Sequence, residues 1–182
     1  YRDAPPPGVL QVTHEMGADP EKAVSFHSLS KRSNLPGLRS GFVATGPVNM
    51  TAIKRLRAYA GAPMPLPLQH VAQLAWSDEA HVEESRALYR EKYAIADAIF
   101  ADWPGDAPPR GGCFLWLKVA DGEDATVKGW RGTGVRVPPG AYLGREVEGV
   151  NPGAGYIRVA MVTKDTDELQ DGLTRLRDCL AG

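Results

Sequence analysis

Residues 28–41 read Ser-Leu-Ser-Lys-Arg-Ser-Asn-Leu-Pro-Gly-Leu-Arg-Ser-Gly, and this polar stretch joins two apolar runs of the chain. The preceding run, Val24–Ser28, has the composition of a buried strand, and an apolar run resumes from Leu38 to Ala44. The sequence therefore predicts strand, loop and strand over residues 23–46. A lone lysine in a loop is ordinarily a solvated charge, but Lys31 lies directly after a predicted strand, which makes it a candidate functional residue.

The side chains of this loop form a chemically coherent set. Lys31 supplies an amine, Ser28 and Ser30 supply hydroxyls, and Arg39 lies eight residues beyond the lysine, where the returning chain can bring its guanidinium back. An amine forms an imine with an aldehyde, and hydroxyls with a guanidinium hold a phosphate dianion. A cofactor that is both an aldehyde and a phosphate ester needs this set, and pyridoxal 5'-phosphate is the obvious candidate.

The same run resembles the cofactor-lysine pattern S-x-S-K-x7-R-x-G of the class I/II aminotransferases, which share the fold of aspartate aminotransferase (fold type I). The resemblance implies that Lys31 is the catalytic residue and carries pyridoxal phosphate covalently. It implies that Ser28, Ser30 and Arg39 bind the phosphate. It also implies that Gly37 and Gly41, in the same stretch, permit tight backbone turns.

Three later stretches also match elements of that family. Ile157-Arg158-Val159-Ala160 resembles the I-R-[FLV]-[SA] element, whose arginine binds the substrate α-carboxylate, so the resemblance makes Arg158 a substrate-binding residue. Residues 111–116 match a core strand, and residues 137–144 match a loop near the substrate entrance. The substrates implied are an amino acid and a 2-oxo acid.

The implied fold class is α/β. Residues 1–66 are expected to be the C-terminal part of the large cofactor-binding domain, residues 67–101 a linking helix, and residues 102–182 the small C-terminal α/β domain with a mostly antiparallel sheet. Chains of the family are considerably longer, and their cofactor lysine lies past the midpoint. We therefore expect this chain to be a C-terminal half, inactive alone and part of a homodimer in the full-length protein.

Local patterns predict further elements. Asn49 is a candidate N-cap for a helix from Met50, and a helical stretch from Leu68 to Ala101 has an expected break at Ser77-Asp78. The pair Asp165 and Glu168 forms a capping box before the final helix. The remaining expectations are a weak helix within residues 1–22, strands at 112–119, 135–137 and 156–162, and a helix at 124–131.

Composition narrows the class of protein. The 182 residues are 43% hydrophobic and 24% charged with a net charge of -1, which is typical of a soluble globular chain and gives no reason to expect nucleic acid as a partner. No apolar run approaches the about 18 residues that span a membrane. The two cysteines are isolated and the four histidines lack metal-ligand spacing, so we expect reduced, buried thiols, no metal and a cytoplasmic protein.

A finer resemblance concerns the substrate. Residues 26–42 and 149–160 are similar to the N-succinyldiaminopimelate aminotransferase subgroup, which implies N-succinyl-LL-2,6-diaminopimelate with 2-oxoglutarate and glutamate, in lysine biosynthesis. Another class I/II aminotransferase, acting on aspartate, alanine, aromatic amino acids or LL-diaminopimelate, is the main alternative. A non-catalytic aminotransferase-like domain of a regulator is a second, and an α/β domain of another role is a third.

Overall fold

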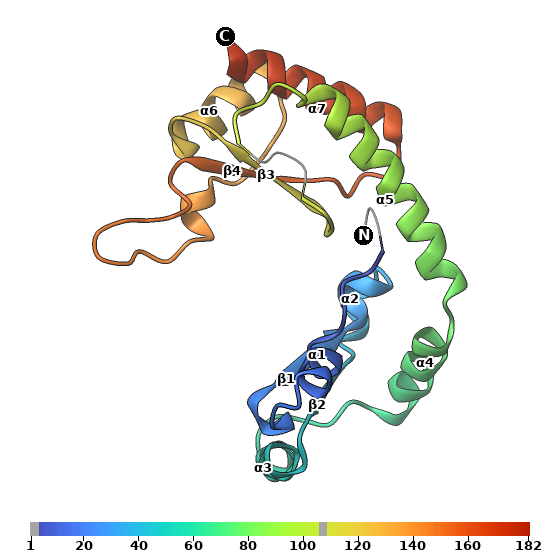
Figure 1. Ribbon diagram of the computed structural model, residues 1–182. Helices are drawn as coiled ribbons and strands as arrows, with labels where there is room; N and C mark the ends of the chain where they lie inside the picture. Colours follow the sequence, from blue (N-terminus) through green and yellow to red (C-terminus); the bar gives the residue numbers. More distant parts are fainter. Residues whose placement is uncertain (1–3, 106–108) are drawn as a thin grey trace. The chain divides into compact units, whose positions relative to one another are not determined.

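The computed structural model describes residues 4–105 and 109–182. The chain divides into two compact units, Pro5–Ser85 and Arg86–Gly182 (Figure 1). Within the described residues, no helix is long and apolar enough to cross a bilayer.

The N-terminal unit is built around one antiparallel pair of strands. β1 (Val24–Ser28) pairs with β2 (Gly41–Thr45), with Val24 opposite Thr45 and Ser28 opposite Gly41. This confirms the two predicted strands, whereas the connection between them, predicted as a loop, contains two short helical segments. The other elements of the unit are α1 (Val9–Glu15), η1 (Pro20–Lys22), α2 (Leu29–Arg32), η2 (Pro36–Leu38), α3 (Pro47–Tyr59), α4 (Leu66–Ser77) and the first residues of α5 (Ala80–Ile99).

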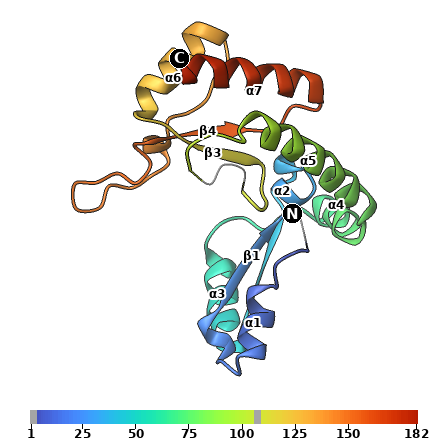
Figure 2. The same ribbon diagram turned by 45° about the horizontal axis from the view of Figure 1, so that its top comes forward.

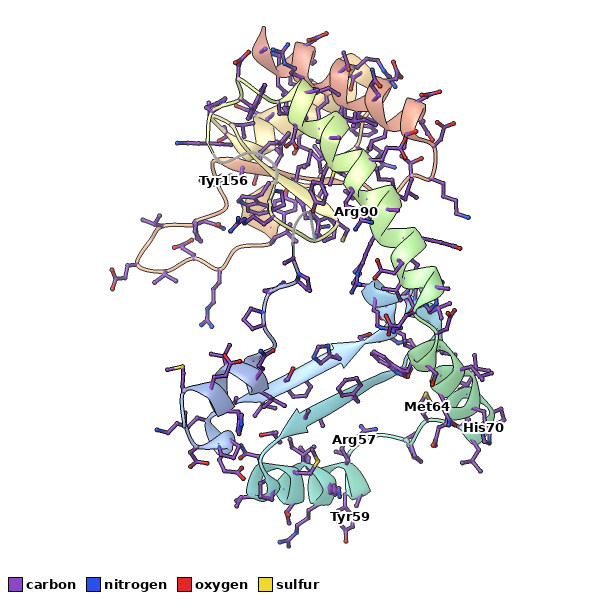
Figure 3. The ribbon with its side chains drawn as sticks, turned by 45° about the vertical axis from the view of Figure 1, so that its right-hand side comes forward. Arg57, Tyr59, Met64, His70, Arg90 and Tyr156 are labelled. Carbon is purple, nitrogen blue, oxygen red and sulfur yellow. The ribbon has the colours of Figure 1, made fainter. Side chains whose placement is uncertain are left out.

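The prediction that β1 is a buried strand is wrong for the described chain. Phe26 is 75% exposed, and Phe42 of β2 is 49% exposed. The reason is that β1 and β2 form a sheet of two strands, so their apolar side chains are not enclosed between layers. Tyr59, at the end of α3, is also exposed and points away from its helix (Figure 3).

Helix α3 begins at Pro47 with Gly46 as its N-cap, so Asn49 lies within the first turn and the predicted Asn49 cap is wrong. The carboxylate of Glu21 takes the capping role, because it accepts hydrogen bonds from the backbone N–H groups of Val48 (2.9 Å) and Asn49 (2.8 Å). A Cβ added at Gly46 would collide with this carboxylate. A partner 25 or more residues away therefore decides where the helix starts.

The predicted break at Ser77-Asp78 is confirmed. Helix α4 ends at Ser77 and α5 starts at Ala80. The carboxylate of Asp78 accepts a hydrogen bond from the N–H of Ala80 (2.9 Å) and contacts His81 Nδ1 at 2.7 Å. The hydrogen bond with His81 lowers the pKa of the Asp78 carboxyl.

The division between the units falls after Ser85, inside α5, and so differs from the boundaries expected at residues 66 and 101. The expected linking helix is shared between the units. Its first helix, α4, contacts α2 of the N-terminal unit. The later part of α5 buries Tyr93 and Ala96 in the C-terminal unit, and Phe100, directly after the helix, is buried there too, which explains why the segment does not separate as a part of its own.

The C-terminal unit has helices on one side of a second antiparallel pair (Figure 2). β3 (Phe114–Lys118) pairs with β4 (Tyr156–Ala160), with Trp116 opposite Arg158. The unit also contains α6 (Gly122–Thr133), η3 (Gly140–Tyr142) and α7 (Thr166–Ala181). The predicted strand at 135–137 is absent, because Pro138 and Pro139 follow it and have no N–H to donate to a ladder; the Pro138 carbonyl instead accepts from Arg158 N (3.1 Å).

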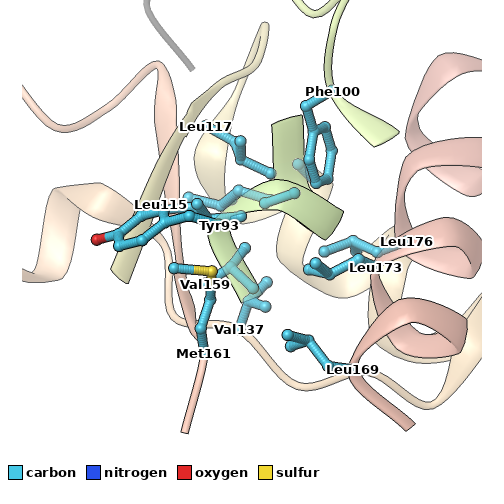
Figure 4. Packing of buried hydrophobic residues seen from close by; sticks show 13 residues of the cluster. Tyr93, Phe100, Leu115, Leu117, Val137, Val159, Met161, Leu169, Leu173 and Leu176 are labelled. Atoms are coloured by element: carbon cyan, nitrogen blue, oxygen red, sulfur yellow. The ribbon is translucent and has the colours of Figure 1, made fainter. Parts of the chain in front are cut away.

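A single hydrophobic cluster holds this unit together (Figure 4). Leu115 and Leu117 of β3 and Ile157 and Val159 of β4 point into it, as the period of two predicts. The cluster also takes buried side chains from α5, α6 and α7: Tyr93, Ala96, Phe100, Ala125, Leu169, Leu173 and Leu176.

The N-cap of α7 is confirmed, since Asp165 Oδ1 accepts from the N–H groups of Asp167 (2.9 Å) and Glu168 (3.1 Å). The reciprocal half of the capping box is replaced, because the Glu168 carboxylate accepts from Thr163 Oγ1 (2.8 Å). The thiols of Cys113 and Cys179 are free and half-buried rather than buried as expected.

Candidate active site

Lys31 is the third residue of α2, a helix of four residues that follows β1 directly. Ser28 is its N-cap: the Ser28 Oγ accepts from the N–H of Ser30 (3.1 Å) and donates to the Ser30 Oγ at 2.9 Å. Leu29 is fully buried beneath the turn, whereas Lys31 is exposed. The structure thus brings the two predicted hydroxyls together at the start of the helix that carries the amine.

The chain returns to this turn at residues 39–41. The Ser40 carbonyl accepts from the Leu29 N–H (3.1 Å) and lies 3.3 Å from Ser28 Oγ. Arg39 takes a left-handed conformation with φ of 53° and donates from Nη1 to the Pro36 carbonyl (3.1 Å). A left-handed arginine costs on the order of 1 kcal/mol. The returning chain thus contacts Ser28 and Leu29 through Ser40, while the Arg39 guanidinium stays on its own loop, and its binding of a phosphate stays a prediction.

The two glycines of the motif differ. A Cβ at Gly41 would lie 2.5 Å from the His27 carbonyl oxygen, so the close approach of β1 and β2 requires glycine there. Gly37 lies in the tight 3-10 turn η2, as expected, but it has no atom within 4 Å of such a Cβ and no positive φ, so this turn does not require glycine. The left-handed positions in the loop are Asn34 and Arg39.

Arg32, which the sequence analysis missed, holds α2 in place. Its guanidinium donates to the Ala75 carbonyl (2.9 Å), pairs with the Glu79 carboxylate and lies over the Trp76 ring at 5.2 Å. Its position next to Lys31 was the available signal, but the partners lie 43 or more residues further along the chain and cannot be read from the sequence.

In the C-terminal unit, Arg158 lies on the face of the β3–β4 pair opposite to the hydrophobic cluster. Its backbone N–H donates to the Pro138 carbonyl (3.1 Å), and its guanidinium lies 4.5 Å from the centre of the Phe114 ring. Arg158 Nε is buried and has no hydrogen-bond partner among the described residues. A buried donor without a hydrogen-bond partner is rare in folded proteins. A bound carboxylate would supply the acceptor, in the two-bond geometry that a guanidinium favours.

Trp116 and Tyr156 share this face, stacked with ring centres 5.5 Å apart. The sequence analysis placed residues 111–116 in a core strand, and this is wrong for Trp116, which is 38% exposed. The alternation of β3 was the signal that could have found it. Gly140 also lies close to this face, since a Cβ at Gly140 would come within 3.0 Å of Trp116 Cη2.

The described residues contain no group of three or more His, Cys, Asp or Glu side chains that could hold a metal. Lys31, Ser28, Ser30 and Arg39 belong to one unit and Arg158 to the other.

Comparison with known proteins gives the class. Residues 5–176 match the model of the family "Aminotransferase class I and II". The chain is 31% identical to the 4-dedimethylamino-4-oxo-anhydrotetracycline transaminase OxyQ of Streptomyces rimosus, over 82% of this chain and 40% of that protein. It is 28% identical to LL-diaminopimelate aminotransferase 2 of a Nostoc species, over 98% of this chain and 44% of that protein.

Solved structures agree. An aminotransferase of Neisseria meningitidis superposes with a TM-score of 0.89 at 36% identity, over 96% of this chain and 45% of that chain. A probable N-succinyldiaminopimelate aminotransferase of Thermus thermophilus gives 0.72 at 24% identity, over 86% and 42%, a likeness that concerns the fold alone. The chain belongs to the class I and II aminotransferase family, and its fold is the fold type I of those proteins. It spans less than half the length of these relatives.

Proposed function

We propose that the protein carrying this chain is a pyridoxal-phosphate-dependent aminotransferase in which Lys31 holds the cofactor. The observation that carries the proposal is the capped turn at the start of α2, where two hydroxyls 2.9 Å apart adjoin the lysine. A surface lysine needs no such surroundings, whereas an aldehyde cofactor with a phosphate uses all of them. The family match of residues 5–176 supports the same conclusion.

The donor set fits that cofactor. The Ser28 and Ser30 hydroxyls can donate hydrogen bonds to a phosphate. The Arg39 guanidinium donates to one carbonyl of its own loop and adds positive charge to the segment between β1 and β2. When bound, the cofactor supplies an electron sink for the bonds at the substrate α-carbon. Lys31 Nζ would hold the cofactor at rest and, once displaced, take the proton from the substrate α-carbon.

Arg158 would fix the substrate. Its guanidinium lies over the Phe114 ring, and its buried Nε has no acceptor among the described residues. A carboxylate bound by two parallel hydrogen bonds has a defined orientation, which presents the α-carbon to the base in one geometry. The amino acid and the 2-oxo acid both carry an α-carboxylate, so one arginine serves both.

For the substrate itself we propose N-succinyl-LL-2,6-diaminopimelate, with 2-oxoglutarate and glutamate as the other pair, in lysine biosynthesis, and a homodimer as the working form. A relative that is 28% identical is named an LL-diaminopimelate aminotransferase, which favours a diaminopimelate-type substrate. Unmodified LL-diaminopimelate is therefore the second candidate. The ratio of kcat/KM for the succinylated and free compounds, with aspartate, alanine and an aromatic amino acid alongside, separates the alternatives.

The cofactor assignment is tested by borohydride reduction followed by peptide mass mapping. We expect the pyridoxyl adduct on Lys31 and its loss in Lys31→Ala. Lys54→Ala is the matched control, because Lys54 is an exposed lysine of α3 in the same unit. An adduct on another lysine, or none, would exclude the proposed function.

A further inference from the structure

Helix α2 has only four residues, Leu29–Arg32, and a helix of this length is not stable by itself because a single turn fixes several dihedral angles for one hydrogen bond. Contacts with the surrounding chain hold it. Ser28 caps its start, Leu29 is buried beneath it, and Arg32 leaves its last position to contact another helix. The first two anchor the N-terminal end. The orientation of the C-terminal end, next to Lys31, depends on Arg32.

The Arg32 guanidinium contacts several hydrogen-bond acceptors at once. Nη1 donates to the carbonyl oxygen of Ala75 at 2.9 Å and to Ser33 Oγ at 3.2 Å. Nη2 contacts the Trp76 carbonyl at 3.4 Å and also the Glu79 carboxylate. The side chain is 21% exposed, so these interactions are partly shielded from water.

Two of these acceptors, the Ala75 and Trp76 carbonyls, lie at the C-terminal end of α4, where carbonyl groups have no partner within their own helix and carry the negative end of its dipole. A guanidinium can reach several of them at once because its donors lie in one plane, whereas an ammonium is a point charge. Trp76 adds a second surface: the guanidinium lies over its ring, and the ring packs at an angle of 62° against the Phe42 ring of β2, with the ring centres 5.0 Å apart. One indole therefore joins α2, α4 and the strand that follows the loop.

We propose that Arg32 is a positioning residue for Lys31, fixing the rotation of α2 by binding the C-terminal end of α4. Neighbouring residues of a helix point about 100° apart. With Arg32 held against α4, Lys31 projects from a different side of α2, and it is exposed in the structure. The part of this inference that concerns catalysis rests on the proposed function, and the part that concerns α2 does not.

The test compares Arg32→Lys and Glu79→Gln with Arg55→Ala, which removes an exposed arginine of α3, in the protein that carries this chain. Amide hydrogen exchange of Ser33 and Leu35, whose N–H groups donate to the Leu29 carbonyl, reports α2 without any cofactor. We expect about tenfold faster exchange in Arg32→Lys and a smaller increase in Glu79→Gln. Arg55→Ala should exchange like the wild type.

Activity gives the second readout. Arg32→Lys should lower kcat about a hundredfold, since a small displacement of a reacting group has effects of that size. KM should change little, because Arg158 is intact. A lower unfolding midpoint with wild-type exchange at Ser33 and Leu35 and wild-type kcat would mean a merely structural role and would overturn the proposal. A wild-type protein without an adduct on Lys31 would refute the proposed function instead, and the exchange result would still decide whether Arg32 holds α2.

Discussion

The two units of the chain are held together in different ways. In Arg86–Gly182, thirteen buried side chains form one cluster, and most of them belong to three helices and two strands. In Pro5–Ser85, the buried apolar side chains among the described residues are Ala23, Leu29, Ala72 and Val82. Its elements are fixed instead by polar contacts to helix ends: Glu21 at α3, Ser28 at α2 and Arg32 at α4.

The difference has a physical meaning. Burial of apolar area gives large but non-directional stabilisation, whereas a hydrogen bond gives about 1 kcal/mol net and a defined direction. The proposed cofactor lysine lies in the unit whose contacts specify direction. The proposed carboxylate-binding arginine lies on a strand whose opposite face is anchored in a core. We expect mutations to separate these two kinds of support.

The largest effect should come from the core. Leu117→Ala removes a fully buried side chain and should lower the free energy of unfolding of the C-terminal unit by about 2–5 kcal/mol. Denaturant titration, monitored by hydrogen exchange of peptides from residues 86–182, measures this loss in free energy. Leu143→Ala, at a 48% exposed position of the same unit, is the control and should change stability by less than about 0.5 kcal/mol. Equal losses in both variants would contradict the comparison.

In the N-terminal unit, we expect the largest loss of stability from a substitution where two backbone segments lie close together. Gly41→Ala forces β1 and β2 apart at the His27 carbonyl and should destabilise the pair by about 1–3 kcal/mol. Gly37→Ala is a close control in the same loop, since no atom lies near its Cβ position. Hydrogen exchange of the amides in residues 24–45 distinguishes them. The comparison fails if Gly37→Ala is the more damaging change.

In the C-terminal unit, loss of a helix N-cap should lower the free energy of unfolding by less than loss of a core side chain. Asp165→Ala removes the acceptor for two N–H groups at the start of α7 and should cost about 1 kcal/mol. The measurement is a thermal unfolding curve, with Gln170→Ala at an exposed position of the same helix as the control. A loss as large as that of Leu117→Ala would show that α7 is held by its end and not by its buried face.

The smallest effect concerns pH. Lys92 is 2% exposed, its Nζ donates to the Met161 carbonyl at 3.0 Å, and burial lowers the pKa of its amine below the usual 10.5. Between the lowered pKa and 10.5 the unfolded chain binds more protons than the folded one, so stability rises with pH over that window. Lys92→Met should flatten this rise in unfolding measured across pH. Lys128→Met, at an exposed position, should leave it unchanged.

Patterns within a few residues were sufficient for much of the fold. The strands around Lys31, the break before Ala80 and the Asp165 cap depend on neighbours, and the structure has all three. The errors arose where a distant partner decided the outcome. Glu21, rather than Asn49, caps the start of α3. The exposure of Phe26 depends on the number of strands in the sheet.

The site followed the same division. Ser28 and Ser30 meet because they share one turn, so their proximity could be predicted. The roles of Arg32 and Trp116 could not be assigned from the sequence, although the alternation of β3 indicates that Trp116 is exposed. The role of Arg32 requires the end of α4, and that of Trp116 requires the register that sets it opposite Arg158.

The contact between Glu21 and the start of α3 links two positions that are far apart in the chain. Position 46 has no room for a side chain while a glutamate carboxylate occupies the space above it. Among natural variants of this protein, we therefore expect the two positions to covary: glycine at 46 wherever 21 is glutamate, and larger residues at 46 where a shorter side chain at 21 leaves the helix to find another cap.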